Sequence, residues 1–152
     1  MLLLGLITTM VSHASSRFTE LKGNPKLRSE SAYVVDAQGN IIYGKDIDTI
    51  RPIASITKLM TAMVILDSGI DLDETITVTK EDRDLVQLTG SRLEYGATLS
   101  RREMILLAVM SSENRAATAL GRTFPGGMEA FNGKMNEKAA SLGMQHSHFS
   151  DP

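Results

Sequence analysis

The sequence predicts an α/β protein in which the N-terminal hairpin of an antiparallel sheet precedes a mostly helical part. Two β-branched and aromatic runs, residues 32–36 and 41–44, flank the turn-forming residues 37–40, which is the pattern of a hairpin. From residue 55 onward, apolar side chains recur mainly at helical spacing. Two strands alone make a marginal sheet. We therefore expect the later strands of this sheet to be missing from this chain, which would be part of a larger domain.

The first predicted helix runs from about Ser55 to Asp67 and ends at Ser68 and Gly69. Its apolar residues recur every three or four positions, so we expect them to form one buried face. These residues are Ile56, Leu59, Met60, Met63 and Val64. A short extended segment, 75–78, follows and leads into a second helix start at 79–82, which has an acidic first turn.

Three more helices are predicted toward the C-terminus. Ser100 and Glu103 have the spacing of a capping box and begin a helix with Met104, Leu107, Ala108 and Val109 on its inner face. A compact alanine-rich helix runs from Asn114 to Leu120. The last helix carries apolar residues at helical spacing and is followed by Gly143 as its C′ residue. Those residues are Phe131, Met135, Ala139 and Leu142.

Composition excludes several classes of function. The chain has 152 residues, 16 basic and 18 acidic side chains, and a net charge of -2, so it has no basic excess for binding nucleic acid. With no cysteine and three histidines, we expect no disulfide and no metal. A hydrophobic fraction of 42% is enough for a packed core.

The first 14 residues have the length and apolar character of a signal peptide, with small residues at Ser12 and Ala14 before a cleavage point. No Lys or Arg precedes the apolar run, which is consistent with a truncated signal peptide; a buried N-terminal helix is the alternative. A signal peptide predicts export, to a periplasm or out of the cell, with membrane association left open. Residues 15–30 form a polar lead-in.

Ser55 and Lys58 form a Ser-x-x-Lys motif at the start of the first helix. Residues three apart lie on one helical face, so the lysine amine can reach the serine hydroxyl. Serine needs a base to become a nucleophile, and a lysine serves as that base when burial or nearby positive charge favours its neutral form. The alternative is a polar helix start with a surface lysine.

Ser112 and Asn114 form a Ser-x-Asn motif between two predicted helices. A hydroxyl here can relay a proton, and a carboxamide can both donate to and accept from an amide substrate. Both residue types are also favoured as helix N-caps, and the two roles are compatible.

Ser-x-x-Lys followed about 55 residues later by Ser-x-Asn is the pattern of serine penicillin-recognising enzymes. Residues 52–62 resemble the active-site helix of low-molecular-mass penicillin-binding proteins, the D-alanyl-D-alanine carboxypeptidase family. The resemblance covers residues 31–152 and implies the N-terminal part of a catalytic domain with a β-lactamase/transpeptidase-like fold. The stretch 112–117 is similar to the branch that includes D,D-endopeptidases.

This resemblance implies a role for each motif residue. Ser55 is the acylated nucleophile and Lys58 its general base, while Ser112 passes a proton to the leaving group. Asn114 binds substrate and helps to hold Lys58, and the backbone N–H of Ser55 stabilises the oxyanion. The implied substrate is a peptidoglycan stem peptide ending in D-Ala-D-Ala, or a cross-link between such peptides. β-Lactams would acylate Ser55, and neither metal nor cofactor is needed.

The family's third motif, Lys-Thr-Gly on a later strand, does not occur after Asn114. We therefore expect the chain as given to be inactive by itself. A β-lactamase of the same fold is one alternative; it would need a deacylating base, for which only Glu129 and Glu137 are available, both predicted at helical surface positions. A non-catalytic peptidoglycan-binding module is the other alternative.

Overall fold

The computed structural model describes residues 25–83 and 90–152. The predicted signal peptide, residues 1–14, lies outside the described residues, as does the lead-in up to residue 24. The chain divides into two compact units, with the boundary between Thr49 and Ile50. We describe each unit by itself.

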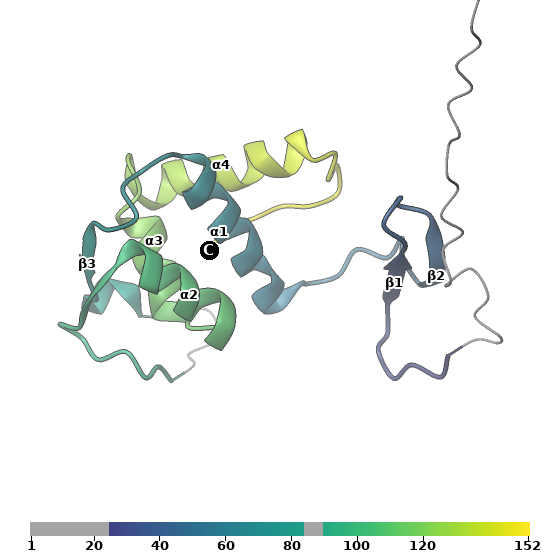
Figure 1. The fold of residues 1–152 in the computed structure, drawn as a ribbon, viewed down its shortest axis with the longest axis horizontal. Coiled ribbons are helices and arrows are strands. Elements are labelled where there is room, and N and C mark those ends of the chain that lie inside the picture. The colour runs from purple at the N-terminus through teal and green to yellow at the C-terminus, as the bar shows by residue number, and fades with distance from the viewer. Residues whose placement is uncertain (1–24, 84–89) are drawn as a thin grey trace, which may run out of the picture. The chain divides into compact units, whose positions relative to one another are not determined.

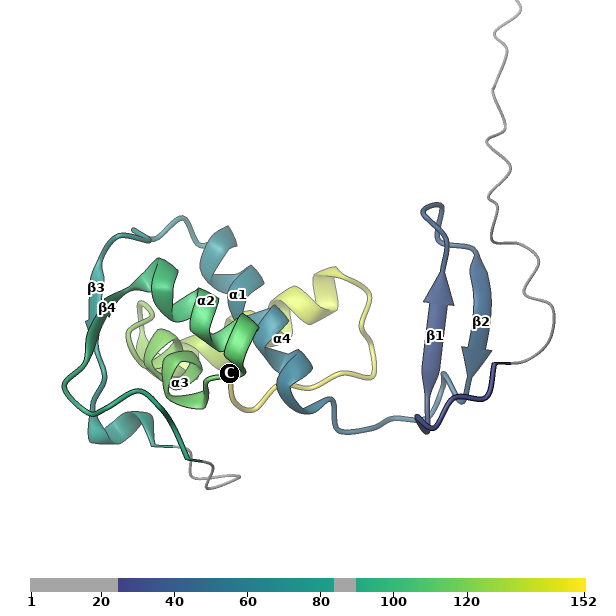
Figure 2. The same ribbon diagram turned by 60° about the horizontal axis from the view of Figure 1, so that its bottom comes forward.

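The predicted hairpin is confirmed in the first unit. Strand β1, Ala32–Val35, pairs antiparallel with strand β2, Ile41–Lys45 (Figure 2). Ala32 lies opposite Lys45, and the register shifts between Val34 and Val35. Both strands are rich in β-branched residues, which suit the pleated backbone.

Asp36 organises the turn between these strands. Its Oδ1 accepts hydrogen bonds from the backbone N–H groups of Gln38 at 2.9 Å and Asn40 at 2.8 Å, and its Oδ2 accepts one from the Asn40 side chain. These bonds, the Asn40 side-chain bond foremost, lower the pKa of the Asp36 carboxyl. Gly39 has φ +85°, a conformation that glycine adopts without steric cost. The turn chemistry thus fixes where the chain reverses.

The second unit is a cluster of helices with one small sheet (Figure 1). The extended segment predicted at 75–78 is present as strand β3, Thr75–Thr77. It pairs antiparallel with strand β4, Thr98–Ser100, which the sequence analysis does not predict. Helix α1 packs against α2, α3 and α4. The elements are η1 Ala54–Ile56, α1 Thr57–Asp67, β3 Thr75–Thr77, η2 Lys80–Asp82, β4 Thr98–Ser100, α2 Arg101–Ser111, α3 Asn114–Arg122 and α4 Gly127–Ser141.

The core of this unit lies where the four α-helices meet. Phe131 and Met135 of α4 are fully buried, and the rings of Phe124 and Phe131 pack edge to face with centroids 5.2 Å apart. Small alanines of α3 (Ala116, Ala117 and Ala119) allow the neighbouring helices to approach closely. Gly143 follows α4 at φ +75°, as expected of a C′ residue.

Three details of the predicted apolar faces are wrong. Leu142, predicted on the face of the last helix, is 52% exposed and lies beyond the end of α4 as its C-cap. In the first predicted helix, Ile56 of η1 and Leu59 of α1 are 62% and 52% exposed, whereas Lys58, Thr61 and Ile65 are buried with Met60 and Val64. The helix is therefore rotated so that Lys58 faces the neighbouring helices, where it reaches Asn114 at the start of α3. In α2, Val109 is exposed, and the inner face is formed by Arg101, Met104 and Ala108.

The helix start predicted at 79–82 is only a short turn in the structure. Thr79 and Asp82 form a capping box, and the element is a single 3-10 turn, η2, which ends at Arg83 in extended conformation. Asp82 accepts bonds from Arg122 of α3, which ties this turn to the core. In the parts of the chain that the structure describes, no helix is both long and apolar enough to cross a membrane.

The predicted capping box of α2 is present and makes a pH-dependent contribution to stability. The backbone N–H and hydroxyl of Ser100 donate to the Glu103 carboxylate at 2.7 and 2.8 Å. These bonds, the backbone one foremost, hold the pKa of Glu103 below its usual 4.5. A lowered folded-state pKa gives stability that is present above 4.5 and is lost as the pH falls through the folded value.

We expect Glu103→Gln to remove this part of the pH dependence. Its urea-unfolding midpoint should then change less than that of the unaltered protein between neutral and acidic pH. Glu129→Gln is the matched control, because Glu129 also lies in the first turn of a helix, α4, but that helix has no side-chain cap. Equal changes in the two variants would show that the capping box contributes no pH dependence.

Candidate active site

Ser55 and Lys58 come from the point where the chain enters α1. Ser55 lies in the 3-10 turn η1 and is exposed, while Lys58 lies in the first turn of α1 and is only 6% exposed. The two residues are three apart and lie on either side of the boundary between η1 and α1. Ala54 precedes them at φ +47°, a left-handed conformation that costs a non-glycine residue about 1–2 kcal/mol. The strained residue therefore lies directly beside the predicted nucleophile.

Ser112 and Asn114 come from the junction of α2 and α3. Ser112 is the C-cap of α2 and is left-handed, with φ 55° and ψ 35°. Glu113, rather than Ser112 or Asn114, is the N-cap of α3: its side chain accepts a hydrogen bond from the backbone N–H of Arg115. Asn114 is the first residue of α3. One helix thus ends and the next begins within three residues, which fixes the direction of both predicted side chains.

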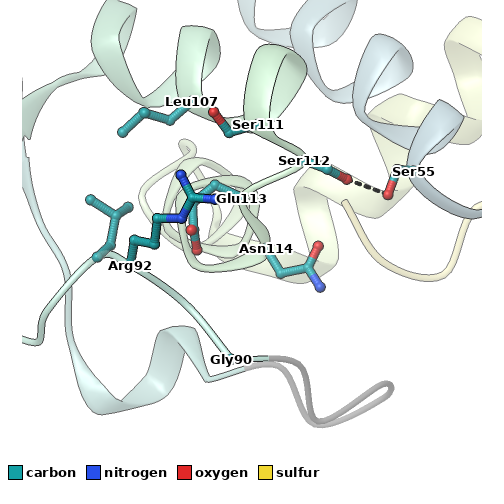
Figure 3. Close-up of a pocket in the computed structure, with 9 residues that line it drawn as sticks. Ser55, Gly90, Arg92, Leu107, Ser111, Ser112, Glu113 and Asn114 are labelled. Atoms are coloured by element: carbon teal, nitrogen blue, oxygen red, sulfur yellow. Dashed lines mark hydrogen bonds between the residues drawn. The ribbon is translucent and has the colours of Figure 1, made fainter.

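The fold brings all four predicted residues together. The hydroxyl groups of Ser112 and Ser55 are hydrogen bonded to each other (Figure 3). Lys58 Nζ donates a hydrogen bond of 2.6 Å to Asn114 Oδ1. Two motifs more than 50 residues apart in sequence therefore form one polar cluster at three helix ends. The burial of Lys58 removes water from its amine, and this is the setting in which a lysine can act as a base.

A pocket of about 430 Å³ opens beside this cluster (Figure 3). Arg92 and Glu113 give it charge of both signs, and Leu93 and Leu107 give it apolar surface. A substrate amide placed over Ser55 would therefore lie in a cleft with polar and apolar walls. The nine lining residues are Ser55, Gly90, Arg92, Leu93, Leu107, Ser111, Ser112, Glu113 and Asn114.

Several of these lining residues were not among the predicted site residues. Arg92 and Leu93 lie in an irregular segment about 20 residues before the Ser-x-Asn motif, and nothing in their local sequence indicates a site. Glu113 lies inside the motif, at the position that the pattern leaves unspecified. Across residues 25–83 and 90–152, no cluster of three or more His, Cys, Asp or Glu side chains is arranged to hold a metal ion. Glu129 and Glu137 lie exposed on α4, as predicted.

Comparison with known proteins identifies the class to which this fold and this cluster belong. The sequence profile of the D-alanyl-D-alanine carboxypeptidase family matches residues 18–152, and the chain belongs to that family. The chain is 42% identical over 159 residues to the D-alanyl-D-alanine endopeptidase of Pseudomonas aeruginosa, covering 99% of this chain and 51% of that protein. It is 47% identical over 129 residues to the D-alanyl-D-alanine endopeptidase of Escherichia coli, covering 84% of this chain and 42% of that protein.

Solved structures support the predicted fold class. The crystal structure of a Streptomyces DD-transpeptidase matches with a TM-score of 0.77 at 30% identity, covering 85% of this chain and 53% of that one. The α/β, transpeptidase-like fold predicted from the motifs is thus confirmed, as is the family resemblance. The chain spans about half the length of the curated relatives that it matches.

Proposed function

We propose that this chain supplies the nucleophile half of the active site of a serine-type D,D-peptidase that cleaves peptidoglycan stem peptides. The observation that carries this proposal is the cluster in which the Ser55 hydroxyl bonds to Ser112 while the buried Lys58 amine bonds to Asn114. Membership of the family supports it. In this proposal Ser55 is the nucleophile, Lys58 its base, Ser112 the proton relay and Asn114 the substrate-binding residue.

The proposed reaction has two steps. Lys58 Nζ takes the proton from Ser55 as Oγ attacks the carbonyl carbon of the scissile amide, and the new C–O bond produces a tetrahedral oxyanion. The C–N bond then breaks, and Ser112 passes a proton from Lys58 to the departing amine. The resulting ester at Ser55 then reacts with water: Lys58 accepts a proton from the water as its oxygen bonds to the carbonyl carbon. The bond from that carbon to Ser55 Oγ breaks, Lys58 returns the proton to Oγ, and the product acid leaves.

An endopeptidase activity is favoured over a carboxypeptidase activity. The relatives that are 42% and 47% identical are named D-alanyl-D-alanine endopeptidases, whereas a relative named D-alanyl-D-alanine carboxypeptidase is 32% identical. The proposed substrate is therefore a cross-link between two stem peptides. A comparison of turnover on a cross-linked muropeptide dimer and on a monomeric pentapeptide distinguishes the two activities.

The proposed substrate has consequences for location and inhibition. Peptidoglycan lies outside the cytoplasm, so we propose export to the periplasm by the signal peptide predicted at residues 1–14. Cleavage of cross-links there would influence cell shape. β-Lactams contain a strained amide that resembles D-Ala-D-Ala, so they would acylate Ser55 and remain bound. Secretion of a reporter fused to residues 1–30 tests the export step.

Covalent labelling with a fluorescent penicillin tests the proposed function. The protein used is the complete product of the gene that encodes this chain. We expect that product to be labelled at Ser55, shown by mass spectrometry of the labelled peptide, and Ser55→Ala to be unlabelled. Absence of label on a folded protein with Ser55 intact would overturn the proposal. Label without turnover of any stem peptide would favour the peptidoglycan-binding alternative.

A further inference from the structure

Glu113 joins the Ser-x-Asn motif to the segment that forms another wall of the pocket. It lies between Ser112 and Asn114, and its Oε1 accepts a hydrogen bond of 2.5 Å from the Ser91 hydroxyl. The same oxygen accepts the 3.2 Å bond from the Arg115 backbone N–H that caps α3. One carboxylate oxygen thus connects two parts of the chain that are 22 residues apart.

Ser91 extends this connection into residues 90–93, of which Gly90, Arg92 and Leu93 line the pocket. The Ser91 Oγ accepts a bond of 3.0 Å from the Leu93 backbone N–H, so the hydroxyl is oriented by its own turn while it donates to Glu113. Bonds to a charged acceptor are roughly twice as strong as neutral ones. The turn and the motif loop are therefore held together by a charge-assisted bond.

Arg115 forms a second connection between the same two segments. Its Nη1 donates a bond of 2.5 Å to the Leu93 backbone carbonyl, and its guanidinium lies 4.1 Å from the centroid of the Tyr95 ring. We use the term brace for the contacts among Ser91, Leu93, Tyr95, Glu113 and Arg115. The brace holds the motif through its middle residue, Glu113, and through Arg115, whereas Ser112 and Asn114 on either side of Glu113 bond to Ser55 and Lys58.

The left-handed backbone conformation of Ser112 is the feature of this junction that needs support from neighbouring residues. This conformation costs a non-glycine residue about 1–2 kcal/mol, and it persists only where the surroundings determine it. On its N-terminal side the junction is held by the bond from the Glu113 N–H to the Leu107 carbonyl, 3.2 Å long. On its C-terminal side the Glu113 carboxylate is the group that both caps α3 and reaches Ser91.

We propose that Glu113 is a positioning residue that, through Ser91, fixes where Ser112 and Asn114 present their side chains to Ser55 and Lys58. This inference rests on the proposed function, because it assigns Glu113 to the same acylation reaction. Glu113 acts through its neighbours and does not exchange a proton with the substrate. Misplacement of a reacting group by about 1 Å can cost about 10²-fold in rate, so loss of the brace should slow acylation without abolishing it.

The test compares Glu113→Ala, Glu113→Gln and Ser91→Ala in the complete gene product. We expect Glu113→Ala to lower the rate constant of penicillin acylation by about 10–10²-fold with little change in the dissociation constant of the initial complex. Glu113→Gln keeps an acceptor oxygen and should retain most of the rate. Ser91→Ala should also slow acylation, by no more than Glu113→Ala, which additionally loses the bond from the Arg115 N–H that caps α3. The double variant should be no slower than Glu113→Ala, because both changes break the bond between Ser91 and Glu113. Glu94→Ala is the matched control: Glu94 is exposed on the same segment, and its side chain makes no hydrogen bond or ion pair among the described residues.

Amide hydrogen exchange tests whether the brace holds this loop, independently of the acylation reaction. The Arg115 and Leu93 amides bond to the Glu113 and Ser91 side chains, so we expect both to exchange faster in Glu113→Ala and to be unchanged in Glu94→Ala. Unchanged exchange, or equal slowing of acylation by Glu113→Ala and Glu94→Ala, would overturn the inference. If the unaltered protein does not react with penicillin, the proposed function fails, and the exchange rates alone decide whether Glu113 holds the loop.

Discussion

Replacing Lys58 by alanine is expected to slow acylation of Ser55 by penicillin by about 10²–10⁴-fold, the range that general acid–base catalysis contributes. The Lys58 amine is buried, and it is held by a 2.6 Å bond to Asn114 Oδ1, within the cluster that contains the Ser55–Ser112 hydrogen bond. Without this amine, the Ser55 proton has no positioned acceptor. The measurement is the second-order rate constant of covalent labelling in the complete gene product.

Two further variants distinguish the loss of a proton acceptor at Lys58 from the loss of its positive charge, and from the general effect of removing a lysine. Lys58→Arg keeps a positive charge but cannot accept a proton, because the guanidinium stays protonated at all accessible pH. It should therefore be about as slow as Lys58→Ala; recovery in Lys58→Arg would mean that Lys58 acts by charge alone. Lys134→Ala is the matched control, since Lys134 is exposed on α4 and pairs only with its helix neighbour Glu137 among the described residues. A Lys58→Ala variant that is folded and labelled at the normal rate would contradict the assignment.

The cluster of Ser55, Lys58, Ser112 and Asn114 could be predicted because each half of it is local in sequence. Ser55 and Lys58 are three residues apart at a helix start, and Ser112 and Asn114 are two apart at a helix junction. The three-residue spacing at a helix start predicts that Ser55 and Lys58 lie close together, and the two-residue spacing keeps Ser112 and Asn114 on one short junction. The meeting of the two pairs was inferred from the family resemblance, and the bond from Lys58 to Asn114 confirms it.

The remaining features depend on tertiary contacts that leave no periodic pattern. Strand β4 has three residues, and it becomes a strand because Leu99 lies opposite Ile76 of β3. The pairing of Ser91 with Glu113 joins an irregular segment to a helix cap. Neither contact follows from spacing or composition, because both are fixed by where the helices pack.

The inner face of α1 shows how a functional residue can override the apolar pattern. The pattern treated Ile56 and Leu59 as core, and both are more than half exposed. Lys58 and Thr61 take the inner positions instead, because the amine must face the start of α3 to reach Asn114. Periodicity assigns burial by hydrophobicity, so it cannot anticipate a buried polar residue that is held by its partner.

The ion pair of Arg122 and Asp82 carries the largest expected effect on stability. The Asp82 side chain is fully buried and accepts bonds of 2.7 and 2.9 Å from Arg122 Nε and Nη2, while its Oδ2 also accepts the Thr79 N–H. The hydrogen bond to Asp82 is the main cause that raises the pKa of Arg122. Removal of one partner of a buried pair leaves an uncompensated charge, which costs about 3–5 kcal/mol.

Arg122→Met should therefore lower the free energy of unfolding by about 3–5 kcal/mol, measured by urea denaturation of the complete gene product. Arg102→Met is the matched control, because Arg102 pairs with Asp73 at 3.4 Å and both side chains are more than half exposed. Exposed pairs contribute about 0–1 kcal/mol. The double variant Arg122→Met/Asp82→Asn should recover part of the loss, since the buried charge is gone while the amide oxygen can still accept from Thr79. Two results would contradict this prediction: an equal loss of unfolding free energy in Arg122→Met and Arg102→Met, or no recovery of it in the double variant. Either would show that the unpaired, buried Asp82 charge is not the cause of the loss.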